Sequence, residues 1–445
     1  MKTIRIGSGA GYAGDRLEPA LDLLKYANLD YICFEGLAER TIALAQKNKK
    51  ADPKKGYNEL LLYRMEKVLP LLHQNKTKVI TNMGAANPKA AMEDIAKLAK
   101  HLGLENLKIA AVLGDDISHK IEEYTAENVI ETSEPLYEIK KELLSANAYL
   151  GIEGIVEALK NDADIIITGR VADPSLFLAP MVYKFGWEKS DWEKKGKGTL
   201  IGHLLECAGQ VTGGYFADPG IKDVPNLWNL GFPYVEVDAS GEGFITKFKE
   251  SGGMVTTATC TEQLLYEIHD PENYLTPDCI ADFSKVIFKE TAQDKVKFEG
   301  ASGKEASHTY KVSVGYLNGF IGEGQMSYGG PNCIARALLA KEIVEKRLEK
   351  LPFDISELRC ELIGINSLLN QDKMPDQLNE VRLRVAGKTQ TKEEAQQIAN
   401  EVETLYTNGP YGGGGATKKV DEIISIASIL IPKEDFKIDV HYIKI

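Results

Sequence analysis

Residues 164–175 read DIIITGRVADPS, and this stretch decides the fold class. Ile165–Ile167 are apolar at consecutive positions, which is typical of a strand buried on both faces of a parallel sheet. Similar short runs alternate with amphipathic stretches earlier in the chain, at Ile4–Ile6, Tyr31–Phe34, Val79–Ile80 and Ile109–Leu113. We therefore predict an α/β domain over residues 1–231, a mostly parallel sheet with helices on both faces.

One helix of this domain can be delimited from its end signals. In NPKAAMEDIAKLAKHLG, residues 87–103, Asn87 suits the N-cap, Pro88 the first helical position and Gly103 the stop. The side chains that share one helical face follow the 3.6-residue period: Met92, Ile95, Ala99 and Leu102.

The pattern of apolar and polar residues changes near Phe232. Short alternating runs broken by Gly and Ser predict a β-rich region, followed by a helix in residues 332–351. The tail predicts a βαβ unit: alternation over 381–385, a capping box between Thr391 and Glu394, a helix, and a strand over 436–442. We expect residues 232–445 to form a smaller α+β domain that ends in this βαβ unit.

Composition narrows the class of protein. The chain has 445 residues, a net charge of -12, and 43% hydrophobic and 27% charged residues. This acidic balance argues against nucleic acid or anionic membrane as a partner. The six cysteines include no C-x-x-C pair, the N-terminus lacks an apolar signal core, and no apolar run approaches the roughly 18 residues of a membrane span. We expect a cytoplasmic protein with reduced thiols.

The carboxyl ends of parallel strands meet at one edge of a sheet, where ligands bind. Each predicted strand is followed there by glycine together with a polar or charged side chain. These segments are Gly7–Asp15, Glu35–Gly36, Thr81–Gly84, Gly114–Asp116 and Thr168–Ser175. Their convergence favours a small-molecule pocket, with Asn82 and Arg170 among its binding residues.

Gly9, Gly11 and Gly14 spell G-x-G-x-x-G, the fingerprint of a dinucleotide cradle. That cradle needs a helix that begins inside the motif. Pro19 favours a helix start near Glu18–Pro19, because proline costs about 3 kcal/mol in a helix interior. We therefore prefer a loop, containing Asp15, whose glycine amides approach an anionic or carbonyl group of a substrate; a purely structural turn stays open.

Further candidates lie after residue 169. Arg170 could grip a carboxylate or phosphate, and Asp173 fits either a helix cap paired with Arg170 or a substrate-binding group. His203 and Cys207 are four residues apart and therefore share one face of a helix. The histidine could activate Cys207 as a thiolate nucleophile, or Cys207 could be a buried cysteine beside a histidine that is hydrogen-bonded elsewhere; both interpretations stay open. The polar string that surrounds Cys207 comprises Glu206, Gln210, Thr212, Gly213 and Gly214.

The second half adds GEGQMSYGGPN, residues 322–332, in which Glu323 and Tyr328 could do acid–base work. GPYGGGGAT, residues 409–417, predicts a loop at a domain interface. No His/Cys metal pattern is present, and we expect no metal. An oxygen-ligated divalent ion on Asp15, Glu35, Asp115 or Asp116 stays an alternative without a motif.

Several long motifs together resemble one family. They are RIGSGAGYAGDRLEPALDLL, FEGLAERTIAL, ITGRVADPSLFLAP, GHLLECAGQVTGGYFADP, LGFPYVEV, TEQLLYEIHDPENYLTPD, EGQMSYGG and GPYGGGG. They look like the acyclic terpene utilisation protein A (AtuA) family. The resemblance implies a setting in citronellol and geraniol breakdown beside an acyl-CoA carboxylase, and implies no catalytic residues. Some members carry a further small domain, which we expect here to be a separate polypeptide because the chain stops at Ile445.

Three hypotheses about function follow. The first is a catabolic enzyme, of lyase or hydratase type, that acts on a small carboxylated or CoA-linked acyl metabolite; Glu35, Glu206, Glu323 and Cys207 are its catalytic candidates. The second is a non-catalytic acyl-CoA-binding or accessory subunit. The third is a nucleotide-dependent oxidoreductase, which Pro19 disfavours. We expect a homo-oligomer, and the sequence identifies no cofactor.

Overall fold

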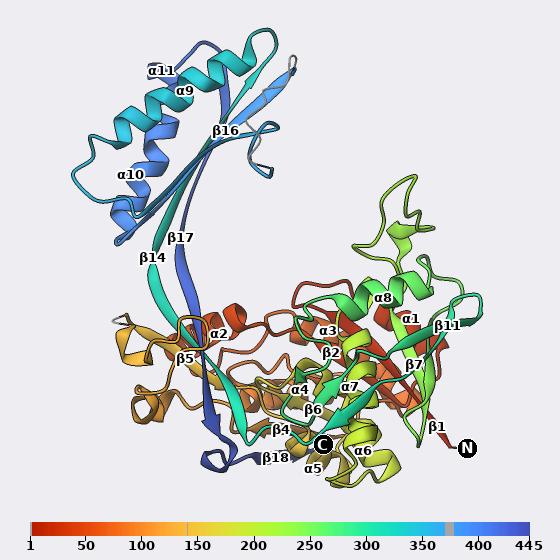
Figure 1. Cartoon of the computed structure of the whole chain (residues 1–445). Helices are drawn as coiled ribbons and strands as arrows, with labels where there is room; N and C mark the ends of the chain where they lie inside the picture. Colours follow the sequence, from red (N-terminus) through yellow and green to blue (C-terminus); the bar gives the residue numbers. More distant parts are fainter. Residues whose placement is uncertain (1, 140, 370–377) are drawn as a thin grey trace. The chain divides into compact units, whose positions relative to one another are not determined.

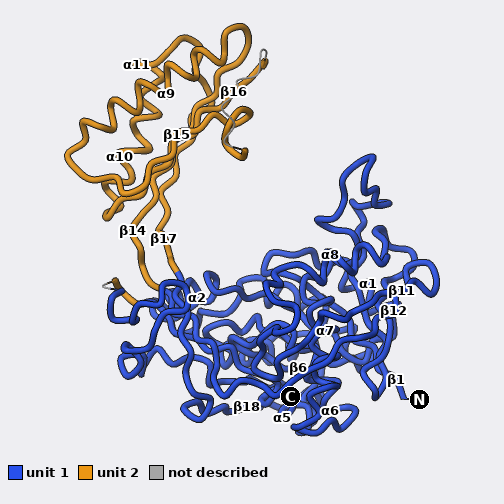
Figure 2. Tube along the Cα trace, in the orientation of Figure 1, with its two compact units in different colours: residues 1–140, 144–315, 426–445 blue, residues 141–143, 316–425 orange. Residues whose placement is uncertain are grey.

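The computed structural model describes residues 2–139, 141–369 and 378–445 (Figure 1). Contacts within the chain divide it into two compact units (Figure 2). Unit 1 comprises residues 1–140, 144–315 and 426–445, and unit 2 comprises residues 141–143 and 316–425.

Unit 1 is built on a ten-stranded sheet whose five central strands are parallel. In spatial order these are β1 (Thr3–Gly11), β2 (Tyr31–Glu35), β3 (Lys78–Thr81), β6 (Ile165–Thr168) and β4 (Lys108–Leu113). Antiparallel strands extend the sheet on both sides. On the β1 side they are β7 (Pro233–Asp238), β8 (Gly243–Lys247), β12 (Lys295–Glu299) and β11 (Ile287–Ala292); on the β4 side the strand is β18 (Asp439–Lys444).

Helices cover both faces of the parallel core, as predicted. Ile32 and Phe34 of β2 share a buried cluster with α1 (Glu18–Tyr26), α3 (Leu61–Asn75) and α4 (Pro88–His101). Cys33, which points to the opposite face because strand side chains alternate, donates its thiol to the Leu176 carbonyl of α6 (Asp173–Phe185). The other helices of unit 1 are α2 (Glu39–Ala51), α5 (Glu153–Lys160), α7 (Trp192–Glu206) and α8 (Thr257–Leu265).

The remaining strands of unit 1 are short. β9 (Tyr274–Leu275), β10 (Ile280–Asp282) and β13 (Ser302–Lys304) form a three-stranded sheet, and β5 (Leu143–Ala148) precedes Tyr149. The predicted helix signals are confirmed: α1 begins at Glu18 with Pro19 in its first turn, and the Asn87 side chain caps α4 by accepting from the Ala90 amide. No helix in the described residues is long and apolar enough to cross a membrane.

Unit 2 contains a β-α-β-β-α-β succession. The elements are β14 (Thr309–Gly329), α9 (Cys333–Leu348), β15 (Glu357–Ile363), β16 (Glu380–Thr389), α10 (Lys392–Glu403) and β17 (Gly413–Pro432), with α11 (Leu405–Asn408) after α10. The strands lie side by side in the order β15-β16-β14-β17. This succession and order define the ferredoxin-like arrangement of two interleaved βαβ halves.

Buried side chains explain why unit 2 forms its own core. The alternating Val381, Leu383 and Val385 of β16 pack with Ile398 and Val402 of α10. The capping box of Thr391 and Glu394 is present at the start of α10, as predicted.

Four expectations about the fold need correction. The large sheet is mixed rather than mostly parallel, because β7, β8 and β18 join it antiparallel. The compact units do not divide at residue 231, since the segment after Phe232 supplies β7 and β8 to the sheet of unit 1. The expected C-terminal βαβ unit is not formed: its last strand, β18, pairs with β4 of the large sheet.

The fourth correction concerns the glycine runs. Gly413–Gly415 open strand β17 rather than forming a loop, and residues 322–329 lie in β14. Gly322 permits close packing there, because a Cβ on it would lie 1.9 Å from the Ala395 carbonyl oxygen of α10.

Candidate functional site

Four of the five central strands of unit 1 deliver a buried polar side chain to one edge of the sheet, as the sequence predicts. Glu35 is the last residue of β2, Asn82 follows β3, and Arg170 follows β6. Asp115 follows β4. All four side chains are buried. Parallel strands bring these groups together although they are separated by up to 135 residues along the chain, from Glu35 to Arg170.

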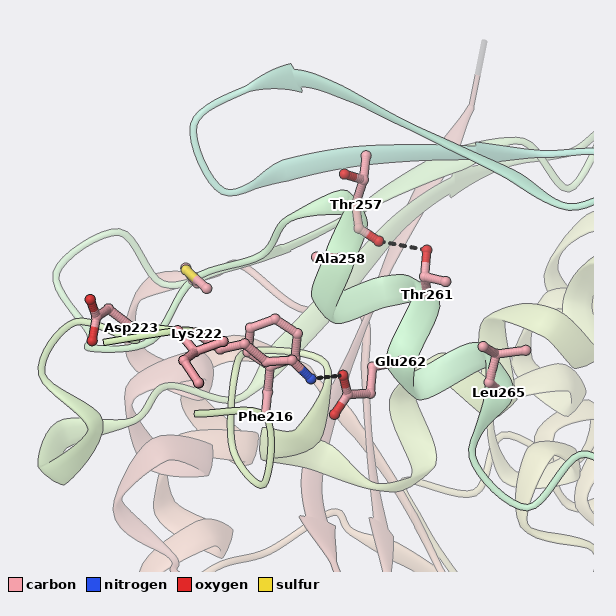
Figure 3. Close-up of a pocket in the computed structure, with 10 residues that line it drawn as sticks. Phe216, Lys222, Asp223, Thr257, Ala258, Thr261, Glu262 and Leu265 are labelled. Carbon is pink, nitrogen blue, oxygen red and sulfur yellow. Dashed lines mark hydrogen bonds and ion pairs between the residues drawn. The ribbon is translucent and has the colours of Figure 1, made fainter. Parts of the chain in front are cut away.

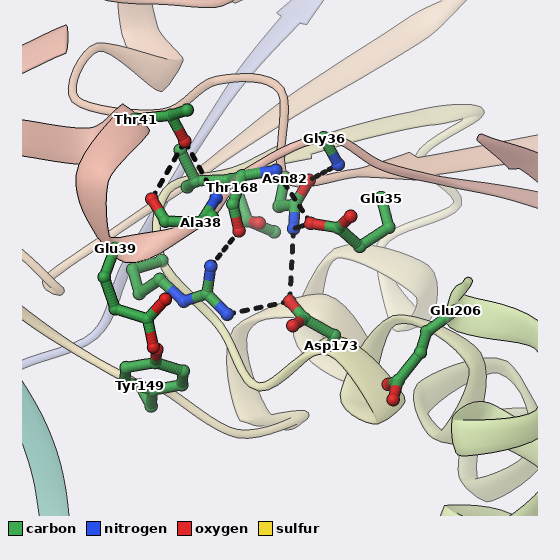
Figure 4. A network of polar contacts seen from close by, with 12 residues as sticks. Glu35, Gly36, Ala38, Glu39, Thr41, Asn82, Tyr149, Thr168, Asp173 and Glu206 are labelled. Atoms are coloured by element: carbon green, nitrogen blue, oxygen red, sulfur yellow. Dashed lines mark hydrogen bonds and ion pairs between the residues drawn. The ribbon is translucent and has the colours of Figure 1, made fainter. Parts of the chain in front are cut away.

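Asn82 connects the groups that follow β2, β3 and β6 (Figure 4). Its Oδ1 accepts from the Gly36 amide at 2.8 Å, and its Nδ2 lies 3.1 Å from Glu35 Oε1 and 3.5 Å from Asp173 Oδ1. Glu35 Oε1 also accepts from the Leu37 amide at 2.7 Å. The side chain of Asn82 therefore fixes both carboxyl groups.

The buried side chain of Arg170 contacts several groups of this network. Its guanidinium is 2% exposed, donates to Asp173 Oδ1 at 2.8 Å and to the Leu37 carbonyl, and lies 4.2 Å from the centre of the Tyr149 ring. Tyr149 in turn donates to Glu39. A guanidinium buried and engaged in this way does not present an open fork to a substrate, so the geometry gives Arg170 a positioning role.

Asp173 does not cap a helix. It is the first residue of α6, Ala172 occupies the N-cap position, and no side-chain hydrogen bond caps this helix. The Asp173 carboxylate instead pairs with Arg170 and faces Asn82. The ion pair in that alternative is confirmed, and the cap is wrong.

Burial sets the electrostatics of the cluster. Burial raises the pKa of Glu35 to about 7. The hydrogen bond from the Leu37 amide, the charge of Arg170 and the hydrogen bond from Asn82 lower this pKa, but burial outweighs them. Burial also raises the pKa of Asp173, and the charges of Glu35 and Glu206 add to this rise while Arg170 opposes it. Glu35 therefore changes its charge near neutral pH.

Asp115 anchors the neighbouring strand end. Its Oδ2 accepts from the Arg170 amide at 2.9 Å and from Asn147 Nδ2 at 2.8 Å. Burial raises the pKa of this carboxyl to about 6. Asp116 forms an ion pair of 3.4 Å with Lys49, so the two acids of this segment have different partners.

Glu206 ends α7 beside the cluster. His203 Nδ1 lies 2.8 Å from Glu206 Oε1, and His203 Nε2 lies 3.2 Å from the Leu264 carbonyl oxygen. Burial lowers the pKa of His203, but the hydrogen bond and charge of Glu206 outweigh it, so the pKa is raised. The histidine pairs with Glu206 rather than with Cys207.

A pocket of about 490 Å³ is lined by residues adjacent to Glu35 and Glu206, although neither carboxyl group lines it itself. Gly11 and Cys207 line it; Gly11 pairs with Glu35 across β1 and β2, and Cys207 follows Glu206 in the chain. The other lining residues mix aromatic, aliphatic and polar groups: Tyr12, Asp15, Arg16, Gly209, Gln210, Gly214, Tyr215, Leu227, Leu230, Phe232 and Tyr266. Five residues that the sequence singles out thus line one pocket: Gly11, Asp15, Cys207, Gln210 and Gly214.

The glycine motif does not form a dinucleotide cradle. Gly9 and Gly11 lie inside β1, and the following helix begins only at Glu18. A Cβ at Gly9 would lie 2.6 Å from the Phe34 ring, so Gly9 serves packing. The Gly11 amide donates to Asp15 Oδ2 at 2.9 Å and is not free for a ligand. Gly14 lines a separate pocket of about 310 Å³.

Three other predicted residues are not among those that line this pocket. Gly213 adopts a φ of +104° and packs against Val224. Glu323 and Tyr328 belong to unit 2, where Glu323 forms an ion pair of 2.7 Å with Arg384 and Tyr328 is buried. Cys207 does line the pocket, but burial raises the pKa of its thiol, which disfavours a thiolate nucleophile.

Sequence reasoning missed residues that only the fold assembles. Arg64 of α3 is buried and donates to the Ala13 and Asp15 carbonyls, which anchors the loop between β1 and α1. Arg16 lines the pocket on this loop. Tyr149 follows β5, a strand that the sequence does not signal. The sequence placed Arg16 beside Asp15 in this loop but did not single it out as a binding residue.

A further pocket, of about 720 Å³, contains none of the predicted site residues (Figure 3). Lys222 lies over the Phe216 ring and pairs with Glu262 of α8 at 2.7 Å. Across the described ranges, no group of three or more His, Cys, Asp or Glu side chains is arranged to hold a metal ion.

Comparison with known proteins gives one family. A family model described as acyclic terpene utilisation family protein AtuA matches residues 4–442. No curated protein and no solved structure gives a significant match. Because the family match covers nearly the whole chain, this protein belongs to the acyclic terpene utilisation family AtuA, and that membership suggests a role in acyclic terpene utilisation.

Proposed function

We propose that the protein is an enzyme that adds water to, or eliminates it from, a small carboxylated or CoA-linked acyl metabolite. One observation carries the proposal: a buried carboxyl whose pKa is about 7, Glu35, interacts with a second carboxyl, Glu206. Each is next to a residue that lines the 490 Å³ pocket, because Gly11 pairs with Glu35 and Cys207 follows Glu206. Two carboxyl groups in different environments can serve as acid and base in one reaction.

The lining of the pocket suits such a substrate. Leu227, Leu230 and Phe232 offer apolar surface to an acyl chain, while Arg16 is the cationic side chain among the described lining residues. Arg16 is exposed, and its Nη1 donates to the Trp228 carbonyl at 3.1 Å. A substrate carboxylate or phosphate would bind Arg16 at the mouth of the pocket.

The proton balance of an elimination fits two carboxyl groups. One carboxylate removes the proton from the carbon next to the acyl carbonyl, and the C=C bond forms as the C–O bond to the β-hydroxyl breaks. The other carboxyl protonates the departing hydroxide, which leaves as water. One carboxyl gains a proton and the other loses one, so no oxidant or external proton is needed.

Ligand binding tests the substrate class first. Ligands of the native state raise its stability by mass action, by about 2.7 kcal/mol at a hundredfold excess over Kd. In a thermal-shift series we expect acyl-CoA esters or di-acids to raise Tm, and NAD(H) and NADP(H) to leave it unchanged. Arg16→Ala should weaken the shift, whereas Arg40→Ala, an exposed arginine outside this pocket, should not.

Turnover tests the reaction. Crotonyl-CoA, 3-methylcrotonyl-CoA and fumarate lose their ultraviolet absorbance when the C=C bond is hydrated. Wild-type protein should hydrate at least one of these probes, and Glu35→Gln should lose most of the rate. Hydration of none of them by a protein that binds them would refute the proposed reaction.

A second candidate, an accessory acyl-CoA-binding subunit, has its own support. Tyr215, Ile221 and Trp228 are 89%, 79% and 78% exposed on one segment beside the pocket. Large exposed apolar side chains mark surfaces that meet partners. Binding of acyl-CoA without turnover by the purified chain would favour this candidate.

A further inference from the structure

Two contacts constrain the protons of His203. Its Nε2 faces the Leu264 carbonyl oxygen at 3.2 Å. A carbonyl oxygen only accepts hydrogen bonds, so Nε2 carries a hydrogen. The contact of 2.8 Å between Nδ1 and Glu206 Oε1 then requires one further proton, which belongs either to the ring or to the carboxyl group.

The surroundings hold the ring in this orientation. The side chain of His203 is 2% exposed and packs against Tyr274, at 5.5 Å between ring centres, and Phe283, at 6.0 Å. Gln263 Nε2 donates to the His203 carbonyl at 2.9 Å. The histidine therefore cannot turn to exchange its two nitrogens without disturbing packed groups.

The second carboxylate oxygen of Glu206, Oε2, lacks the hydrogen bond that Oε1 makes. Glu206 Oε2 is buried and has no hydrogen-bond partner among the described residues. An unpaired buried carboxylate oxygen is costly, so Oε2 requires a partner from outside the chain, such as a water molecule or a substrate atom. Glu206 also precedes Cys207, which lines the 490 Å³ pocket.

We infer that His203 and Glu206 hold one proton between Nδ1 and Oε1, and that Glu206 Oε2 is the atom that accepts the substrate proton. This inference rests on the proposed function and deepens it, because it makes Glu206 the base and Glu35 the acid. His203 is a positioning residue: it occupies Oε1 and leaves Oε2 free. After the substrate proton has moved to Oε2, the His203–Glu206 pair holds two protons in addition to the hydrogen on Nε2. Glu35 has then given one proton to the leaving hydroxide.

Several titratable groups face this couple. Glu35, Asp173, Cys207 and Tyr274 all interact electrostatically with Glu206. Glu267 interacts with Cys207 and Tyr274 from the segment after α8. Any pH response of His203 must therefore be separated from theirs by single substitutions.

Nuclear magnetic resonance of wild-type protein tests the shared proton without a substrate. The chain contains seven histidines, so His203 is assigned by loss of its signals in His203→Asn or, if that variant does not fold, by replacing the other six one at a time. At pH 7.5 we expect a protonated Nε2 and either a protonated Nδ1 or a protonated Glu206 carboxyl. A bare Nδ1 beside an ionised Glu206 would overturn the inference.

Substitution then tests the coupling. In Glu206→Gln the ring should be neutral with its hydrogen on Nε2, and its titration midpoint should fall by about one pH unit or more. Glu267→Gln, an exposed neighbour, should leave the ring signals unchanged. An unchanged midpoint in Glu206→Gln would overturn the coupling.

A pH profile separates this inference from the proposed function. If hydration occurs, Glu206 gives back the proton that it accepts in elimination, so Glu206→Gln should remove the limb of the profile that belongs to the acid, and His203→Gln should shift that limb. Hydration with an unshifted limb would refute the role of His203 and leave the proposed function standing. The expected resonances without hydration would refute the reaction and leave the shared proton standing.

Discussion

Glu35 illustrates how one buried carboxyl couples stability to pH. Its pKa is about 7 in the folded protein, against an ordinary value of 4.5. The folded state therefore binds the proton more tightly, so stability is fully present below pH 4.5 and is lost as the pH rises through 7. The cost at pH 8 is at most about 3 kcal/mol.

Glu35→Gln should remove this loss. The Gln oxygen can still accept from the Leu37 amide and Asn82, so the fold is kept. We expect the variant to match wild type near pH 4 and to be more stable at pH 8, measured by chemical denaturation across that range. Equal pH slopes for the two proteins would show that Glu35 does not titrate as described.

Substitution of Arg170 should lower the stability of the protein, whereas substitution of Glu35 should raise it at high pH. Arg170→Ala leaves Asp173, whose side chain is 31% exposed, near Glu35 without its cation, which should cost about 1–3 kcal/mol of unfolding free energy. Arg170→Ala combined with Asp173→Asn should recover part of this loss, since the uncompensated charge is gone. Lys346→Ala, which breaks an exposed pair with Glu342, should barely change stability.

The packing of β1 against the segment after α7 depends on a missing side chain. A Cβ at Gly11 would lie 2.6 Å from the Cys207 carbonyl carbon, and a backbone atom cannot move aside as a side chain can. Gly11→Ala should therefore destabilise the protein by about 1–3 kcal/mol. Gly14→Ala is the matched control: its Cβ would meet only the exposed Tyr12 ring, and denaturation should show little change.

The start of α10 makes a prediction within unit 2. Thr391 accepts from the Glu394 amide, and Glu394 accepts from the Thr391 amide. Thr391→Ala should cost about 1 kcal/mol and increase amide hydrogen exchange in the first turn of α10. Thr391→Ser keeps the hydroxyl and should retain the wild-type exchange rates.

At the scale of the whole molecule, unit 2 is an insertion. All ten strands of the large sheet belong to unit 1, and the chain leaves and re-enters that unit near residues 315 and 426. The two ends of the insertion are neighbours, because Asn318 Nδ2 donates to Ser425 Oγ at 2.9 Å. Insertions with adjacent ends can often be removed without loss of the host fold.

Replacement of residues 319–424 by a short Gly/Ser linker should therefore leave unit 1 folded. We expect cooperative thermal unfolding and near-ultraviolet circular dichroism to persist. Truncation after Lys437 is the contrasting variant: it removes β18, which pairs with β4, and should lower Tm. Loss of cooperative unfolding in the linker variant alone would show that unit 1 depends on the insertion.

The accuracy of the sequence predictions followed the range of the interactions involved. The start of α1 at Glu18, the Asn87 cap and the Thr391 capping box depend on neighbouring residues, and all three are confirmed. Asp173 failed as a cap because a long-range network with Asn82 and the buried Arg170 competes for its carboxylate. Tyr149 was missed because its partners, Glu39 and Arg170, lie far away in sequence.

The sequence by itself determined the buried strands, the helix ends and the convergence of Glu35, Asn82 and Arg170, because periodicity, capping and parallel topology are local or general rules. Only the tertiary structure decided which strands extend the sheet, since antiparallel pairing of β7 and β18 joins segments distant in sequence. It also decided that His203 pairs with Glu206, because the ring is oriented by groups from α8, β9 and the segment beyond them. Long-range packing has no signature in a short stretch of sequence.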